Sequence, residues 1–162
     1  MILIAGIGNI FMGDDAFGSE VARRLGQHLT LPRARVVDFG IRGLDLAFAL
    51  MDEYDSTIIV DTTCGGEIPG TIQVIEPDLN ELDASRVAIE AHAMDPMRVL
   101  ALARSMGAQL KNIRIVGCEP ESLEPKLGLS STVAVAVDRA MEVIQSLVSL
   151  PSEDTKETGG TL

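Results

Sequence analysis

The amino-acid sequence predicts an α/β protein with a mostly parallel sheet, and three features of the chain lead to this prediction. The first eighteen residues have the pattern of a strand, a glycine-containing loop and the beginning of a helix. Residues 57–60 are β-branched throughout, as expected for a central strand covered on both faces. Only nine residues, 62–70, separate this strand from the next one. A parallel crossover needs about a dozen residues or more, so we expect the fourth strand to run antiparallel.

Five strands are expected in order along the chain. Each is a short run rich in apolar and β-branched residues, and they lie at 2–5, 35–39, 57–60, 71–75 and 113–116. The fifth of these strands follows a predicted helix.

Four helices are expected between these strands, at 15–28, 44–51, 96–106 and 131–150. The third begins with Asp95 as N-cap and Pro96 at the first helical position, a pattern typical of helix starts. The fourth is capped by Ser130 or Ser131. Its residues 133–137 alternate as in a strand, but its length and the spacing of the apolar residues that follow favour a helix.

Length and composition indicate a single domain over residues 1–150, followed by a polar tail, 151–162, that we expect to be disordered. The formal charge of −11, with four Phe, one Tyr and no Trp, argues against a nucleic acid or an anionic membrane as partner. A basic or neutral protein fits this charge better. Because we find no secretory signal and no apolar run near the ~20 residues of a membrane span, we expect a cytoplasmic protein. We also expect a monomer.

The two cysteines, Cys64 and Cys118, are far apart in the sequence and form no Cys-x-x-Cys motif. Neither a disulfide framework nor a thiolate zinc site is therefore indicated. We expect both to behave as small, buried apolar residues.

The loop after the first strand looks at first like a phosphate-binding turn, but two positions argue against this. Phe11 stands where the dinucleotide fingerprint needs its third glycine. Asp14 and Asp15 stand where a mononucleotide loop has Lys and Ser or Thr. Two carboxylates at a helix N-terminus suit a metal cation or a cationic group instead, although a single Asp there is commonly no more than an N-cap.

A candidate metal site follows from where the strands end. Asp15 lies beyond the first strand and Asp61 ends the third, so the two carboxylates can reach one ion if these strands are neighbours. His92, in a loop before a helix, could complete the set, and three ligands leave positions open for substrate. Oxygen and nitrogen donors suit zinc, nickel, manganese or iron. The alternative is that both Asp residues cap turns and that His92 lies at the surface. Asp38, at another strand end, could orient the first loop or hydrogen-bond to the side chains that hold the metal.

Four groups of residues together form a recognisable set: Gly6-Ile7-Gly8-Asn9 with Asp14-Asp15 and Gly18, then Ile59-Val60-Asp61, then His92, and then Gly117 with Glu119-Pro120-Glu121-Ser122-Leu123-Glu124-Pro125. With this set the sequence resembles the [NiFe]-hydrogenase maturation endopeptidases. These enzymes remove a C-terminal extension from the hydrogenase large-subunit precursor after nickel has been inserted. The resemblance covers residues 1 to about 150.

The resemblance implies a three-layer α/β/α sandwich with a five-stranded mixed sheet. It also implies that Asp15, Asp61 and His92 contact nickel and are the catalytic residues, and that the nickel arrives with the substrate precursor. The sequence departs from the common family pattern at two places. Ala16 stands where Gly is frequent, and residues 38–40, Asp-Phe-Gly, replace a frequent Asp-Gly-Gly.

Other functional classes remain open at this point. A cysteine hydrolase would use Cys64 with His92, and a non-enzymatic module would bind a metal or a nucleotide without cleaving anything. Within the protease hypothesis, the metal either activates water and polarises the scissile carbonyl or serves only as a docking check.

Overall fold

The computed structural model describes residues 1–28, 30–82 and 95–150 of the chain. In this part of the chain, one sheet is formed by the strands β1 (Ile2–Ile7), β2 (Ala34–Gly40), β3 (Ser56–Thr62), β4 (Ile72–Ile75) and β5 (Ile113–Cys118). Their order across the sheet is β2-β1-β3-β5-β4. Neighbouring strands are parallel except β4, which pairs antiparallel with β5. The predicted mixed sheet with an antiparallel fourth strand is confirmed.

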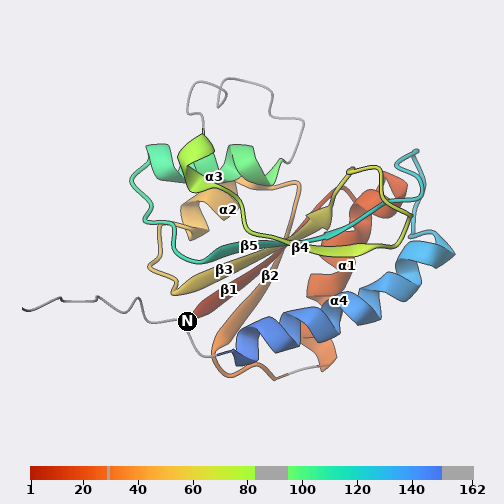
Figure 1. The fold of residues 1–162 in the computed structure, drawn as a ribbon, viewed down its shortest axis with the longest axis horizontal. Helices are drawn as coiled ribbons and strands as arrows, with labels where there is room; N and C mark the ends of the chain where they lie inside the picture. Colours follow the sequence, from red (N-terminus) through yellow and green to blue (C-terminus); the bar gives the residue numbers. More distant parts are fainter. Residues whose placement is uncertain (29, 83–94, 151–162) are drawn as a thin grey trace, which may run out of the picture.

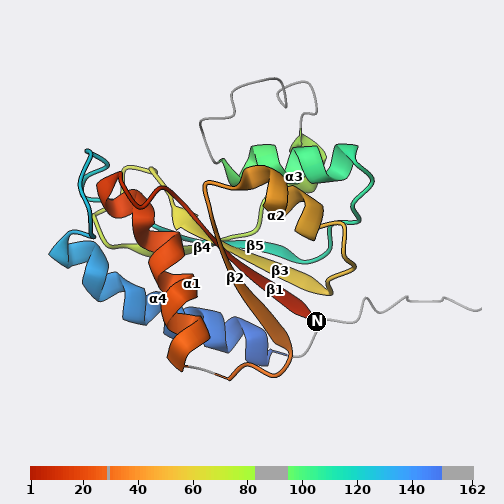
Figure 2. The ribbon, with the colours of Figure 1, turned by 180° about the vertical axis from the view of Figure 1, so that it is seen from behind.

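Helices cover both faces of this sheet. The described α-helices are α1 (Phe17–His28), α2 (Gly43–Ala49), α3 (Pro96–Ser105) and α4 (Ser131–Ser149), with short 3-10 turns η1 (Gly13–Ala16) and η2 (Leu79–Glu81). Figures 1 and 2 show α1 and α4 on one face of the sheet and α2 and α3 on the other. The fold is therefore the three-layer α/β/α sandwich that the family resemblance implies.

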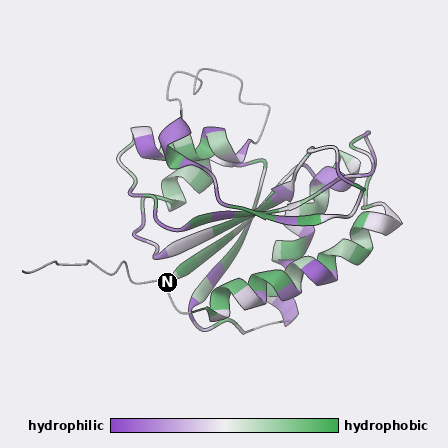
Figure 3. Cartoon of the chain, in the orientation of Figure 1, coloured by the Kyte–Doolittle hydropathy of each residue, from purple (hydrophilic) through white to green (hydrophobic). Residues whose placement is uncertain are grey.

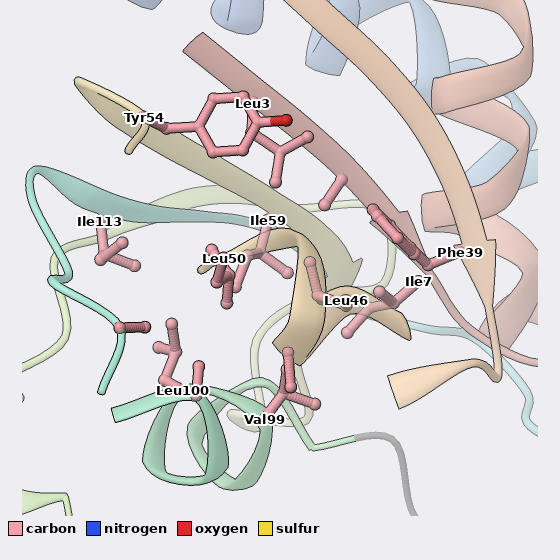
Figure 4. Packing of buried hydrophobic residues seen from close by; sticks show 14 of the residues in the cluster. Leu3, Ile7, Phe39, Leu46, Leu50, Tyr54, Ile59, Val99, Leu100 and Ile113 are labelled. Atoms are coloured by element: carbon pink, nitrogen blue, oxygen red, sulfur yellow. The ribbon is translucent and has the colours of Figure 1, made fainter. Parts of the chain in front are cut away.

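Each face of the sheet packs against its own hydrophobic core, which explains why the central strands are continuous apolar runs. On β1, Leu3 and Ile7 belong to the core beneath α2 and α3 (Figure 4), whereas Ile4 belongs to the core beneath α1 and α4. β3 divides in the same way, with Ile59 on the first side and Val60 on the second. Figure 3 shows the hydrophobic residues concentrated on these strands and on the helix sides that face them. The sheet is thereby held rigidly from both sides.

Both predicted helix caps are present. The Asp95 side chain accepts the amide of Met97 at 2.9 Å, and Ser130 accepts the amide of Val133 at 3.3 Å. The stretch 133–137 is helical, as the spacing of the later apolar residues predicts. Each cap satisfies a backbone N–H that the first turn of a helix leaves unpaired.

Some predicted boundaries are wrong. α1 begins at Phe17 rather than Asp15, because the chain first makes the η1 turn. β3 continues through Asp61 to Thr62, and β5 continues to Cys118, because these two strands pair with each other up to their last residues. Asp61 is therefore a residue of the strand itself, and its position is fixed by the sheet.

Three predictions fall partly or wholly outside the described residues: the disordered tail 151–162, the extent of the single domain beyond the described ranges, and the position of His92. Among the helices of the described ranges, none combines the length and apolar character that crossing a membrane requires.

Candidate active site

The carboxyl ends of β1 and β3 lie side by side, as the site hypothesis requires. The two strands pair in parallel, with Gly6 opposite Val60. The η1 turn that follows β1 places Asp15 against the end of β3, where its Oδ1 accepts the hydroxyl of Thr62 at 3.1 Å. Its Oδ2 accepts the amide of Asn9 at 2.8 Å. These two bonds fix the Asp15 carboxylate beside the strand that carries Asp61.

A glycine in the first loop makes this arrangement possible. Gly8 has a φ of +139°, and a Cβ built on it would lie only 1.8 Å from the carbonyl oxygen of Asp15. Any side chain at this position would therefore push the turn away from the strand end. The glycines of this loop allow close backbone packing around a carboxylate and do not form a phosphate cradle.

Asp61 is almost fully buried, with 6% of its surface exposed. Its Oδ1 accepts the amide of Thr62 at 2.8 Å. Burial raises the pKa of Asp61 to about 8, and the negative charges of Asp15 and Asp95 contribute to the rise. A buried acid of this kind holds a proton at neutral pH. Strongly perturbed acids of this kind are typical of functional sites.

The third predicted ligand, His92, lies outside the described residues. Asp95 follows it by three residues, and the charge of Asp95 acts on Asp61. In residues 1–28, 30–82 and 95–150, no three His, Cys, Asp or Glu side chains are grouped closely enough to hold a metal ion. The structure thus brings together two of the three predicted ligands.

Asp38 orients the first loop, as one of the sequence hypotheses holds. Its Oδ1 accepts the amide of Gly40 at 3.0 Å and the hydroxyl of Ser19 at 2.7 Å. The carbonyl of Gly40 in turn accepts the amide of Gly8 at 3.0 Å. Phe39, which departs from the common family pattern, is a buried core residue, and Gly40 keeps a positive φ of 55°. The substitution at Phe39 therefore leaves the turn intact.

Glu119 is a buried acid that sequence reasoning did not assign to the site. Its Oε2 accepts the amide of Gly65 at 2.9 Å, and its Oε1 accepts that of Gly66 at 3.2 Å. These bonds fasten the loop that follows Asp61 to the end of β5. The only signal in the sequence is the Glu119-Pro120 pair within the family motif.

Cys64 is exposed, so the prediction that it is buried is wrong, whereas Cys118 is buried as predicted. Cys64 lies in the loop that Glu119 fastens, where Gly-rich backbone leaves its side chain uncovered. Partial desolvation raises the pKa of the Cys64 thiol, and the negative charges of Glu119, Asp15 and Asp61 raise it further. Burial raises the pKa of Cys118 to about 11. The described surroundings thus raise the pKa of both thiols instead of lowering it, which argues against the cysteine-hydrolase alternative.

Comparison with known proteins identifies relatives along most of the chain. A sequence model of the HycI hydrogenase maturation proteases matches residues 19–147. The hydrogenase 2 maturation protease of Escherichia coli is 32% identical over 146 residues, 88% of this chain and 87% of that protein. A putative hydrogenase maturation protease of Methanocaldococcus jannaschii is 35% identical over 149 residues, 88% of this chain and 93% of that protein.

The solved structure of the hydrogenase maturating endopeptidase HybD from E. coli has the same fold. It superposes with a TM-score of 0.72 at 30% sequence identity, covering 91% of each chain. The family model, the relatives and the shared fold agree, and the chain belongs to the hydrogenase maturation protease family.

Proposed function

We propose that this chain removes the C-terminal extension of a [NiFe]-hydrogenase large-subunit precursor after nickel insertion, and that Asp15, Asp61 and His92 recognise the inserted nickel. The observation that carries the proposal is the buried Asp61 carboxyl group, whose pKa is raised to about 8 beside the fixed carboxylate of Asp15. A structural role for Asp61 would not require a buried acid that is held protonated at neutral pH. A divalent ion delivered to this place supplies the positive charge that allows Asp61 to ionise.

The donor set suits an ion that belongs to the substrate. Two carboxylates and one imidazole provide three ligands and leave coordination positions open, and oxygen and nitrogen donors fit nickel among other first-row metals. Without thiolates, the empty site holds free metal weakly. The nickel of the precursor therefore completes the site only when the precursor docks.

Selectivity follows from the charge of the empty site. While Asp61 holds its proton, the negative charge of Asp15 repels the acidic groups of a partner and gains little from a neutral peptide, whereas an embedded divalent ion is attracted to both side chains. Asp61 gives up its proton as the ion binds, and Asp15 is already held in place by Thr62 and Asn9. The nickel-loaded precursor is thereby bound in preference to the empty one, with its scissile bond positioned at the site.

The chain bears a formal charge of −11, which fits a protein partner better than nucleic acid or an anionic membrane. The proposal includes a monomeric enzyme acting in the cytoplasm.

The test is to incubate the enzyme with nickel-loaded and nickel-free precursor at equal concentration, adding no free metal, and to follow the C-terminal mass of the precursor. We expect cleavage of the nickel-loaded form alone. Equal cleavage of both forms would refute nickel recognition. A zinc-loaded precursor, processed in parallel, separates a requirement for charge from a requirement for nickel itself.

A further inference from the structure

Asp14 is a buried carboxylate that the proposed nickel site does not use. Only 1% of its surface is exposed. Its Oδ2 accepts the amides of Glu121 at 2.9 Å and Ser122 at 3.1 Å. Ser130 donates its amide to Oδ1 at 2.7 Å and its hydroxyl to Oδ2 at 2.9 Å. Four donors from one distant loop thus converge on this one side chain.

These four hydrogen bonds satisfy both oxygens of the buried Asp14 side chain. An ionised carboxylate satisfied by backbone amides makes strong hydrogen bonds, and it cannot release the loop without leaving a buried charge unpaired. Asp14 is therefore a clamp on the segment after β5.

The backbone next to Asp14 strengthens this clamp. Gly13 donates its amide to the carbonyl of Lys126 at 2.9 Å, and Lys126 donates to Phe11 at 3.0 Å. The Asp14 amide donates to the carbonyl of Ser122 at 3.0 Å. A Cβ on Gly13 would lie 2.8 Å from that same carbonyl oxygen, so the two segments touch backbone to backbone. Figures 1 and 2 both show the β5–α4 loop beside the beginning of α1.

The segment that is held so firmly, residues 121–127, is exposed along its whole length. Leu127 is 70% exposed, Leu123 is 36% exposed, and Phe11 on the paired segment is 63% exposed. A rigid loop with exposed apolar side chains has lost its flexibility before any partner arrives, which lowers the entropic cost of binding. We call residues 121–127 the docking loop.

We propose that the docking loop binds an apolar, basic segment of the hydrogenase precursor beside the carboxylate site, and that Asp14 is the positioning residue for this contact. The inference rests on the proposed function. The docking loop is joined to the site through the η1 turn, in which Asp15 directly follows Asp14. A segment bound there lies next to the place where nickel is recognised.

Charge determines the chemistry of the bound segment. The docking loop and the η1 turn surround a hollow of about 260 Å³, which is bordered by Glu121, Glu124 and Lys126. The hollow thus has two exposed carboxylates, from Glu121 and Glu124, and one ammonium group, from Lys126. This excess of negative charge, in a chain with a formal charge of −11, favours a basic side chain of the partner. Leu127 and Phe11, which are exposed on the two hydrogen-bonded segments, supply the apolar contact.

The first test is Asp14→Asn, because the amide NH₂ of asparagine cannot accept the loop N–H groups. With nickel-loaded precursor at varied concentration, we expect KM to rise about tenfold while kcat stays within about twofold of wild type. A purely structural role has a different signature, since partial unfolding removes active enzyme and lowers the apparent kcat at an unchanged KM. Ile144→Val, which shortens a buried side chain of α4, serves as the control for lost stability. An Asp14→Asn variant that behaves like this control would overturn the proposal.

Surface variants test the docking loop without touching the clamp. Leu127→Ser and Glu124→Gln are each expected to raise KM severalfold at unchanged stability. Their controls are Leu150→Ser, an equally apolar and exposed change near the opposite end of the sheet, and Glu142→Gln on α4. Unchanged KM in both loop variants would refute the docking loop. Wild-type enzyme is assayed in the same series, and a failure to cleave there would refute the proposed function instead.

Discussion

Replacing Asp61 with asparagine is expected to make the metal-free protein less sensitive to pH while abolishing cleavage. The pKa of Asp61 rises from 3.8 to about 8 on folding, mainly because of burial. Between these values the unfolded chain is ionised at this position while the folded chain still carries the proton. The folded state thus binds more protons, and its stability falls as pH rises across this window.

The size of the effect follows from the same two pKa values. One pKa unit corresponds to about 1.4 kcal/mol, so Asp61 lowers the free energy of unfolding by about 2 kcal/mol at pH 5 and about 4 kcal/mol at pH 7, relative to a permanently neutral side chain. Asparagine has nearly the same shape and carries no charge. Its NH₂ group needs a hydrogen-bond acceptor, and an unmet donor costs about 1–3 kcal/mol at every pH. The net gain at pH 7 is therefore about 1–3 kcal/mol.

The measurement is urea unfolding at pH 5, 6, 7 and 8 with a chelator present, followed by circular dichroism because the chain contains no Trp. The difference in stability between Asp61→Asn and wild type is expected to grow by about 1.4 kcal/mol per pH unit from pH 5 to pH 7. Comparing the two proteins removes the contribution of all other titrating groups. A difference that stays flat with pH would refute the raised pKa, whatever its absolute size. The control is Asp78→Asn, the same substitution at an exposed cap.

Three further predictions concern the site. First, the variants Asp15→Asn and His92→Ala are expected to fold, as judged by circular dichroism. They are expected to lose processing, as judged by the C-terminal mass of the precursor. Full activity in either variant would remove that residue from the site. Second, the isolated enzyme is expected to retain no stoichiometric metal after dialysis against chelator, because the site lacks thiolate ligands. Metal that survives this treatment, as measured by elemental analysis, would contradict the proposal. Third, Cys64→Ser and Cys118→Ser are expected to cleave nickel-loaded precursor at a rate within about twofold of wild type, since the pKa of each thiol is raised. Loss of cleavage in Cys64→Ser with binding intact would point to a covalent mechanism.

Local patterns in the sequence were enough to predict the elements of the fold. The short connection at 62–70 forces β4 to run antiparallel, and the apolar runs of β1 and β3 require cover on both faces. The start of α3 at Asp95 also depends only on neighbouring residues, because a cap bonds amides two or three positions away. The element boundaries were less accurate, because pairing with another strand decides where β3 and β5 end.

The roles of the acids were decided by tertiary structure alone. Asp14 and Asp15 are adjacent in the sequence and chemically identical, but Asp14 faces amides from a loop more than 100 residues away, whereas Asp15 faces the end of β3. Asp61 acquires its raised pKa from burial and from charges brought close by folding, and Glu119 becomes a loop anchor only because β5 ends beside Gly65. The sequence by itself determined which residues can carry a charge. Desolvation and hydrogen-bond donors from distant segments, which exist only in the folded chain, determined which of these acids anchor a loop and which one is held protonated at neutral pH.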